Sequence, residues 1–170
     1  MGIAITLAQY LMERGVPYDV IEHAPTETAY QSATASHIPP DRIAKAVVLE
    51  GREGFVLAVL PASRHIQFAD LRRELGRYVD IAKEEQIEAL FLDCEAGAVP
   101  ALGGAYGLKV VVDDSLANEP EMYLEGGDHL SLVHMSGAAF RELLADAQHA
   151  RFTCAARTAG GGGVPHRPVA

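Results

Sequence analysis

The sequence predicts an α+β (mixed α/β) fold, in which a twisted, mixed sheet of six or seven strands is flanked by helices. Three observations lead to this prediction. The chain has 170 residues, which is enough for one domain with its own core. Short apolar runs typical of strands are interspersed with amphipathic segments typical of helices. The order of these elements is neither strictly alternating nor segregated, which favours a mixed sheet.

The first expected element is a helix that begins near Thr6. Thr6 and Gln9 have the spacing of a capping box, apolar residues follow at helical spacing, and Gly15 ends the turn. Three shorter elements are expected next: a strand over 18–22, a helix over 31–37, and a turn through Ile43 that Asp41 caps.

The strongest hairpin signal follows directly. Two apolar runs, 46–49 and 55–60, are separated by the turn sequence Gly51-Arg52-Glu53-Gly54. The pattern then predicts an amphipathic helix over 68–75 closed by Gly76, a strand over 78–82 and a helix over 83–91.

A glycine-rich stretch over 97–107 is expected to be irregular. After it come a buried strand over 109–112, a second hairpin formed by 122–124 and 130–135, and a last helix that Ser136 caps. From residue 150 the sequence turns to glycine and proline. We therefore expect a domain over 1–149 and a flexible tail over 150–170.

Composition limits the classes of function. The net charge is −9, which argues against tight, non-specific binding of nucleic acid but allows brief contact with one RNA end. The first residues resemble neither a signal peptide nor a membrane span. Two cysteines, Cys94 and Cys154, do not make a disulfide framework, so reduced thiols in the cytoplasm are expected.

Lys45 is the first residue that could carry chemistry. It lies at the start of a strongly apolar strand, where burial would keep its ammonium group from full hydration. Such a lysine suits contact with a phosphate or a polarised carbonyl. The alternative is a strand-end lysine whose ammonium extends into solvent.

Two glycine-rich segments are further candidates. The 97–107 stretch would let backbone groups approach a ligand closely, but it lacks a P-loop ending and a dinucleotide fingerprint. The second segment is Gly126-Gly127-Asp128-His129. His129 and His134 are five residues apart and would face opposite sides of one strand, which argues against a shared metal. The sequence also offers no nucleophile elbow and no cysteine at a helix start.

Taken together, three motifs resemble the YbaK/prolyl-tRNA-editing family of aminoacyl-tRNA deacylases. They are Ala44-Lys45-Ala46-Val47-Val48-Leu49, Gly97-Ala98-Val99-Pro100-Ala101-Leu102-Gly103 and Gly126-Gly127-Asp128-His129. Leu-Pro-Ala-Ser at 60–63 and Val-Asp-Asp-Ser-Leu at 112–116 are also similar to this family. The resemblance extends from about Ile3 to Leu144.

The resemblance implies hydrolysis of the ester between a wrong amino acid and the 3′ end of tRNA, without a metal or other cofactor. The neighbouring ribose hydroxyl would help to activate water. Lys45 would hold the terminal phosphate or the ester carbonyl, and His129 would help to position the substrate. The other implied substrate-binding residues are Val47, Gly97, Ala98, Val99, Pro100, Ala101, Gly103 and Gly127. Basic contacts for the acceptor end would be Arg42, Arg64, His65 and Lys109.

Two departures from the family pattern bear on specificity. Many relatives carry Gly-x-x-x-Pro in the loop, whereas this chain has Ala101 at the fifth position and a proline at Pro100. Ala46 follows the lysine where relatives often have a polar residue. A compact pocket walled by Val47, Leu49 and the glycine loop would admit alanine, serine or cysteine, for example on proline tRNA. One methylene gives a synthetase only about 1–3 kcal/mol of discrimination, which is why a second sieve is useful.

Two other functions stay open at this point. A non-catalytic module of the same fold would bind tRNA or a synthetase without deacylation. A hydrolase of other small aminoacyl esters or thioesters would act at rates that tRNA does not change. The expected partners are mischarged tRNA and a synthetase, with neither DNA nor a membrane.

Overall fold

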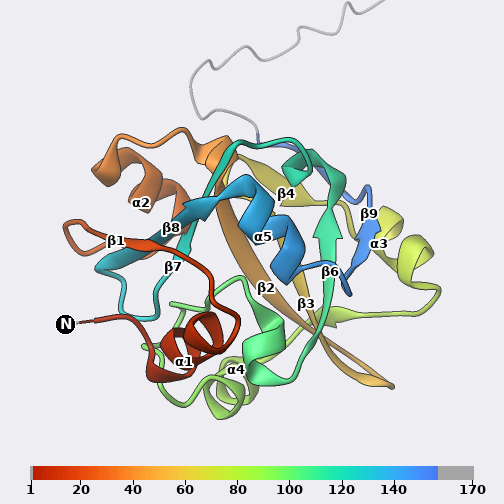
Figure 1. Ribbon diagram of the computed structural model, residues 1–170. Coiled ribbons are helices and arrows are strands. Elements are labelled where there is room, and N and C mark those ends of the chain that lie inside the picture. Colours follow the sequence, from red (N-terminus) through yellow and green to blue (C-terminus); the bar gives the residue numbers. More distant parts are fainter. Residues whose placement is uncertain (1, 157–170) are drawn as a thin grey trace, which may run out of the picture.

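The computed structural model describes residues 2–156, which form a mixed sheet with helices on both faces (Figure 1). The helical elements are α1 (Ile5–Glu13), α2 (Ala29–Ser36), η1 (Pro40–Arg42), α3 (Phe68–Leu75), α4 (Glu84–Leu90), η2 (Gly103–Tyr106), η3 (Asp114–Leu116) and α5 (Gly137–Leu143). The strands are β1 (Asp19–Glu22), β2 (Ile43–Gly51), β3 (Gly54–Pro61), β4 (Arg64–Ile66), β5 (Asp80–Ile81), β6 (Lys109–Asp113), β7 (Glu121–Glu125), β8 (Ser131–Ser136), β9 (Gln148–Ala150) and β10 (Thr153–Ala155).

The main sheet is mixed, as predicted. Its strand order is β1-β8-β7-β2-β3-β6-β9, and β5 also pairs with β2. The β2–β7, β3–β6 and β6–β9 pairs are parallel and the others are antiparallel. Within the described residues this sheet has eight strands, one more than the upper prediction. The three residues of β9 are too few for a recognisable apolar alternation.

The predicted β2–β3 hairpin is the centre of the sheet. It pairs continuously from Ala44 opposite Pro61 to Gly51 opposite Gly54. Both faces of β2 are covered, because Val48 belongs to one core cluster and its neighbour Leu49 to another. This two-sided burial explains why the strand reads as a nearly continuous apolar run.

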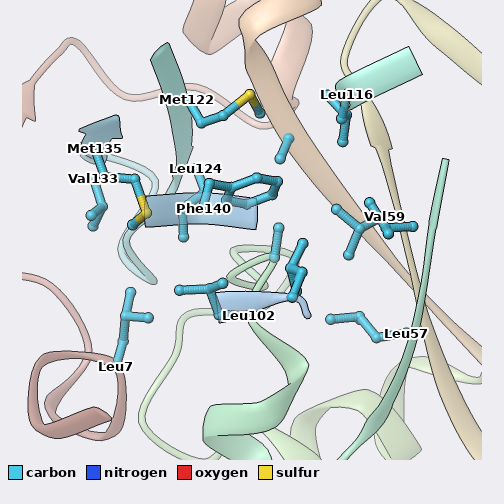
Figure 2. Close-up of a cluster of buried hydrophobic side chains, with 14 of the residues drawn as sticks. Leu7, Leu57, Val59, Leu102, Leu116, Met122, Leu124, Val133, Met135 and Phe140 are labelled. Carbon is cyan, nitrogen blue, oxygen red and sulfur yellow. The ribbon is translucent and has the colours of Figure 1, made fainter. Parts of the chain in front are cut away.

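The larger core cluster lies on the face covered by α1 and α5 (Figure 2). Leu7 from α1, Phe140 from α5 and Leu57 from β3 meet there, all with at most 1% of their surface exposed. The opposite face buries Leu71 of α3 and Phe152. Close packing on both sides fixes the ends of the central strands, where the candidate site lies.

The start of α1 differs from its prediction. The helix begins at Ile5 with Ala4 as its N-cap, and no side chain of its own provides a cap. Instead, the Thr6 N–H donates to Asp93 Oδ2 at 2.8 Å, and the Ala4 N–H donates to the carbonyl of Gly126 at 2.8 Å. The capping box predicted from Thr6 and Gln9 is therefore wrong, because partners distant in sequence satisfy these donors.

Two other boundaries are corrected. α2 begins at Ala29, two residues early, since the Thr28 hydroxyl caps it by accepting from the Gln31 N–H. The 97–107 stretch is not wholly irregular, because it contains η2. None of the described helices is long and apolar enough to cross a bilayer.

The folded part extends past residue 149, where the domain was expected to end. β10 pairs with β4, and Phe152 is fully buried. The Asp113 carboxylate accepts hydrogen bonds from the Phe152 N–H and the Thr153 hydroxyl, both at 3.0 Å. Burial alone would raise the pKa of Asp113, but these bonds and those from Ser115 outweigh it and hold the pKa below its ordinary value. Residues 157–170 of the expected tail lie outside the described residues.

Candidate functional site

A small cavity of about 160 Å³ brings together residues from four segments of the chain. These segments are the start of α2, the first half of β2, the glycine loop that begins at Gly97, and the β7–β8 turn. The lining residues are Glu27, Thr28, Ala29, Ser32, Ile43, Ala44, Lys45, Ala46, Gly97, Val99, Glu125, His129 and Leu132. Lys45, Gly97, Val99 and His129, which the motifs singled out, therefore lie around one space.

Lys45 is a half-buried cation. Its ammonium makes no ion pair and no hydrogen bond with any residue between 2 and 156. Burial lowers its pKa below the ordinary value of 10.5, because the charged form loses hydration. A cation held in this way favours a ligand that brings an anionic or strongly polarised oxygen.

Lys45 and Glu125 lie side by side on neighbouring strands. The parallel register of β2 and β7 aligns Ile43 with Tyr123 and Ala44 with Leu124. The next residues, Lys45 and Glu125, therefore come to the same level and face the same side of the sheet. They line the same cavity, yet no ion pair of 4.0 Å or less joins them.

His129 is held in an unusual backbone conformation. Its φ is 59°, in the left-handed region that non-glycine residues rarely adopt. Glu125 Oε1 accepts hydrogen bonds from the N–H groups of Gly127 and His129, each at 3.1 Å. The His129 Nε2 atom lies 2.6 Å from the carbonyl oxygen of Ala96. Because a carbonyl only accepts, Nε2 carries the proton, which leaves Nδ1 as an acceptor in the neutral ring.

Asp128 stabilises the β7–β8 turn and does not line the cavity. Its Oδ1 accepts from the N–H groups of Leu130 and Ser131 at 2.9 and 2.8 Å, and its Oδ2 accepts from the Ser131 hydroxyl at 2.9 Å. Both carboxylate oxygens are thus engaged inside the turn that presents His129.

Only part of the glycine loop reaches the cavity. Gly97 and Val99 line it, whereas Ala98, Pro100 and Ala101 are buried beneath. Gly103 packs against Val110 and Leu57, and Gly127 packs against Ala4 and Cys94. Of the residues expected to bind substrate, these five buried ones do not line this cavity.

Gly97 needs its glycine for conformational reasons. Its φ is +81°, and a Cβ there would sit 3.6 Å from the His129 ring, which is ordinary contact. Gly97→Ala should therefore lower the free energy of unfolding by about 1–2 kcal/mol through backbone strain rather than collision. Urea denaturation measures this, with Gly2→Ala as the control, since Gly2 has no positive φ and no neighbour within 4 Å. An unchanged midpoint for Gly97→Ala would contradict the strain.

A second, more apolar cavity of about 320 Å³ adjoins the first and shares Ala46, Gly97 and Val99 with it. Val47 lines this second cavity. Leu49, expected as a wall of the substrate pocket, lines neither cavity, because it is fully buried on the α3 side. Cys94 also borders the second cavity, and burial raises the pKa of its thiol to about 11. The thiol is therefore neutral at physiological pH.

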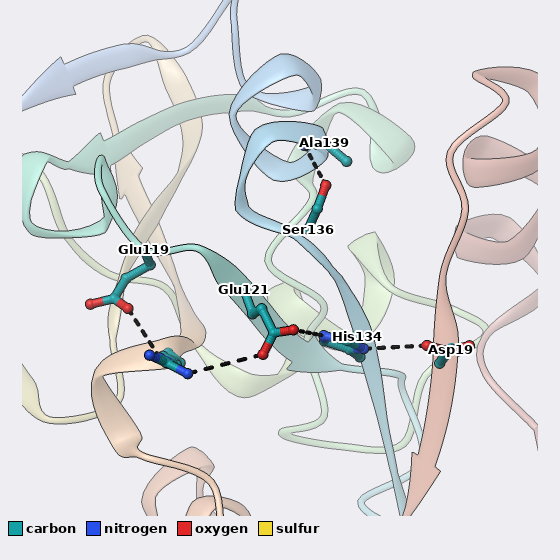
Figure 3. Close-up of polar contacts among 7 residues, drawn as sticks. Asp19, Glu119, Glu121, His134, Ser136 and Ala139 are labelled. Carbon is teal, nitrogen blue, oxygen red and sulfur yellow. Dashed lines mark hydrogen bonds and ion pairs between the residues drawn. The ribbon is translucent and has the colours of Figure 1, made fainter.

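The four basic residues expected to contact tRNA are not gathered at the cavity. Arg42 forms ion pairs with Glu119 at 3.3 Å and Glu121 at 4.0 Å, in a network that continues through His134 to Asp19 (Figure 3). Arg64 donates to the Thr153 hydroxyl at 2.6 Å. The other two lie elsewhere: His65 is exposed on β4, and Lys109 lines a third cavity beside α5.

Several cavity residues were missed by sequence analysis. Glu27, Thr28 and Ser32 come from the start of α2, where Thr28 could have been identified as an N-cap. Glu125 directly precedes the Gly-Gly-Asp-His motif, but nothing in the sequence shows that its carboxylate turns back onto that motif.

Comparison with known proteins gives a consistent result. A model of the aminoacyl-tRNA editing domain family matches residues 23–143. A proline–tRNA ligase of Thermosipho africanus (strain TCF52B) is 36% identical over 61 residues, which cover 35% of this chain and 11% of the ligase. The chain thus matches only about a tenth of that curated relative's length.

Solved structures share the fold over most of the chain. A crystal structure of a candidate trans-editing enzyme for prolyl-tRNA synthetase has a TM-score of 0.76 and 26% identity, covering 88% of this chain and 95% of that one. A hypothetical protein with 21% identity also has a TM-score of 0.76, covering 88% of this chain and 99% of its own, and shows likeness of fold alone.

Proposed function

We propose that this chain, which belongs to the aminoacyl-tRNA editing domain family, is a free-standing deacylase that hydrolyses mischarged tRNA in trans. Its substrate would carry a small amino acid, such as alanine, serine or cysteine on proline tRNA. The supporting observation is the desolvated ammonium of Lys45, which has no partner among residues 2–156 and lies in a cavity that also holds His129 and Gly97.

The chemistry requires little of the protein. An aminoacyl ester is already reactive, so positioning the ester and stabilising the developing oxyanion are the main tasks. Water attacks the ester carbon, the C–O bond to the ribose breaks, and the ribose oxygen leaves with a proton. Lys45 would stabilise the oxyanion, and the adjacent ribose hydroxyl would orient the water. His129, with Nδ1 as an acceptor, would hold a hydroxyl of the substrate.

The size of the cavity supports a small amino acid. The cavity of about 160 Å³ is small beside ligand pockets in general, which measure about 300–1,000 Å³. Rejection of larger side chains is part of the proposal, because the cavity wall includes the backbone of β2 and the rigid turn before His129.

The test is a deacylation panel on proline tRNA charged with alanine, serine, cysteine or proline, in the presence and absence of EDTA. We expect turnover of at least one small mischarged ester, no hydrolysis of the correctly charged one, and no effect of the chelator. Hydrolysis of every ester at its spontaneous rate would favour the binding-module alternative. Hydrolysis of free aminoacyl esters at rates that tRNA does not change would favour a general esterase.

A further inference from the structure

We propose that Glu125 binds the α-ammonium group of the substrate, so that the site accepts only aminoacyl esters with a free amine. This inference rests on the proposed deacylase function and adds a requirement to it. It assigns to Glu125, which none of the three motifs includes, a role in substrate specificity.

The geometry leaves one oxygen of Glu125 for a ligand. Oε1 accepts from the N–H groups of Gly127 and His129, which fixes the carboxylate against the turn. Between residues 2 and 156, no hydrogen bond or ion pair engages Oε2. Asp128, the other carboxylate of this turn, differs because both of its oxygens are satisfied within the turn.

The pairing of charges around the cavity matches an aminoacyl ester. Lys45 and Glu125 face the same side of adjacent strands and line one cavity without forming an ion pair. A ligand with a polarised carbonyl and an ammonium two bonds away would satisfy both at once. The α-amino group has an ordinary pKa of about 8 and is therefore largely protonated at pH 7.

The net charge of the lining points in the same direction. Two carboxylates, Glu27 and Glu125, face one ammonium, Lys45. Lys45 alone would repel the positively charged amine of a ligand. A carboxylate fixed beside the lysine offsets that repulsion. Between the two carboxylates, Glu125 is the better candidate, because hydrogen bonds to the backbone hold it in place, whereas Glu27 is exposed.

This arrangement predicts which esters the enzyme leaves intact. Acylation of the amine removes its charge and adds bulk, so N-acetylalanyl-tRNA should be a poor substrate. The same would hold for any tRNA whose amino acid is joined through its nitrogen to a peptide. A charged hydrogen bond of this kind contributes on the order of ten- to a hundredfold in affinity.

The experiment compares alanyl-tRNA with N-acetylalanyl-tRNA for the intact protein and for Glu125→Gln. The amide oxygen of glutamine can still accept from Gly127 and His129, so the turn is retained while the charge is removed. We expect the intact protein to prefer alanyl-tRNA by at least about tenfold in kcat/KM. In Glu125→Gln this preference should disappear, mainly through a higher KM for alanyl-tRNA. Glu22→Gln, the same change on exposed β1, is the control and should keep the preference.

The outcomes separate this inference from the proposed function. If the intact protein hydrolyses both esters equally, Glu125 has no such role, while the deacylase function stands. The inference is also overturned if Glu125→Gln keeps the preference. If neither ester is hydrolysed and proline tRNA charged with other small amino acids is also left intact, the proposed function fails with it.

Discussion

Replacing Lys45 by alanine should lower kcat/KM for the preferred mischarged tRNA by at least about a hundredfold. The ammonium is the one desolvated cation among the residues that line the described cavity, and loss of a single oxyanion-stabilising group costs on the order of 10²–10³ in rate. Lys83→Ala is the matched control, since Lys83 is exposed beside α4 and lines no part of this cavity. A rate near that of the intact protein in Lys45→Ala would contradict the role of Lys45.

Removing the charge of Lys45 should increase stability, although it lowers activity. Its folded-state pKa lies below its ordinary value, so the unfolded chain binds this proton more tightly than the folded one. Stability therefore rises with pH between the folded pKa and 10.5, and below this window the charged side chain opposes folding. Lys45→Met, which keeps the length without the charge, should raise the free energy of unfolding at pH 7 in urea titrations. Lower stability in this variant would mean that Lys45 has a compensating partner.

The largest expected effect on stability comes from Phe152→Ala. Phe152 is fully buried in the core cluster that includes Leu49, Leu60 and Leu71, and its backbone N–H donates to Asp113. Removing such a ring from a packed core typically costs about 3–5 kcal/mol. Urea denaturation followed by circular dichroism measures the loss.

A control variant and the size of the loss decide whether residues 150–155 belong to the folded domain. Tyr78→Ala removes an aromatic ring that is 66% exposed and should change the free energy of unfolding far less. If Phe152→Ala changes it by less than about 1 kcal/mol, residues 150–155 do not belong to the folded domain. The boundary expected at residue 149 would then be the better one.

The elements that sequence analysis predicted well have local causes. The β2–β3 hairpin follows from two apolar runs around a glycine turn, and the Ser136 hydroxyl caps α5 by accepting from the Ala139 N–H. The features that it missed depend on distant partners. α1 is capped through Asp93, 87 residues away, and β10 is recognisable only by its pairing with β4. No short window of sequence contains those contacts.

The residues of the candidate site were likewise predicted only in part. Family resemblance singled out Lys45, Gly97, Val99 and His129, and the structure places all four around one cavity. The contribution of Glu125 could not be predicted, because it depends on the parallel register between β2 and β7. Of the basic residues expected to contact the acceptor end, Arg42 is paired with Glu119 and Glu121, and these pairings cannot be seen in the sequence.

The pairing of β10 with β4 also has a consequence for biosynthesis. Thr153 lies opposite Ile66, and the Ala156 N–H donates to the carbonyl of Ser63, so this contact closes a loop that spans about half of the chain. Such long-range contacts form late because ordering the intervening chain costs entropy first. While the protein is being translated, the part of the α3-side core that Phe152 fills stays open until β9 and β10 have left the ribosome. A nascent chain that stalls before them would expose apolar surface, and chaperone binding to stalled chains would report it.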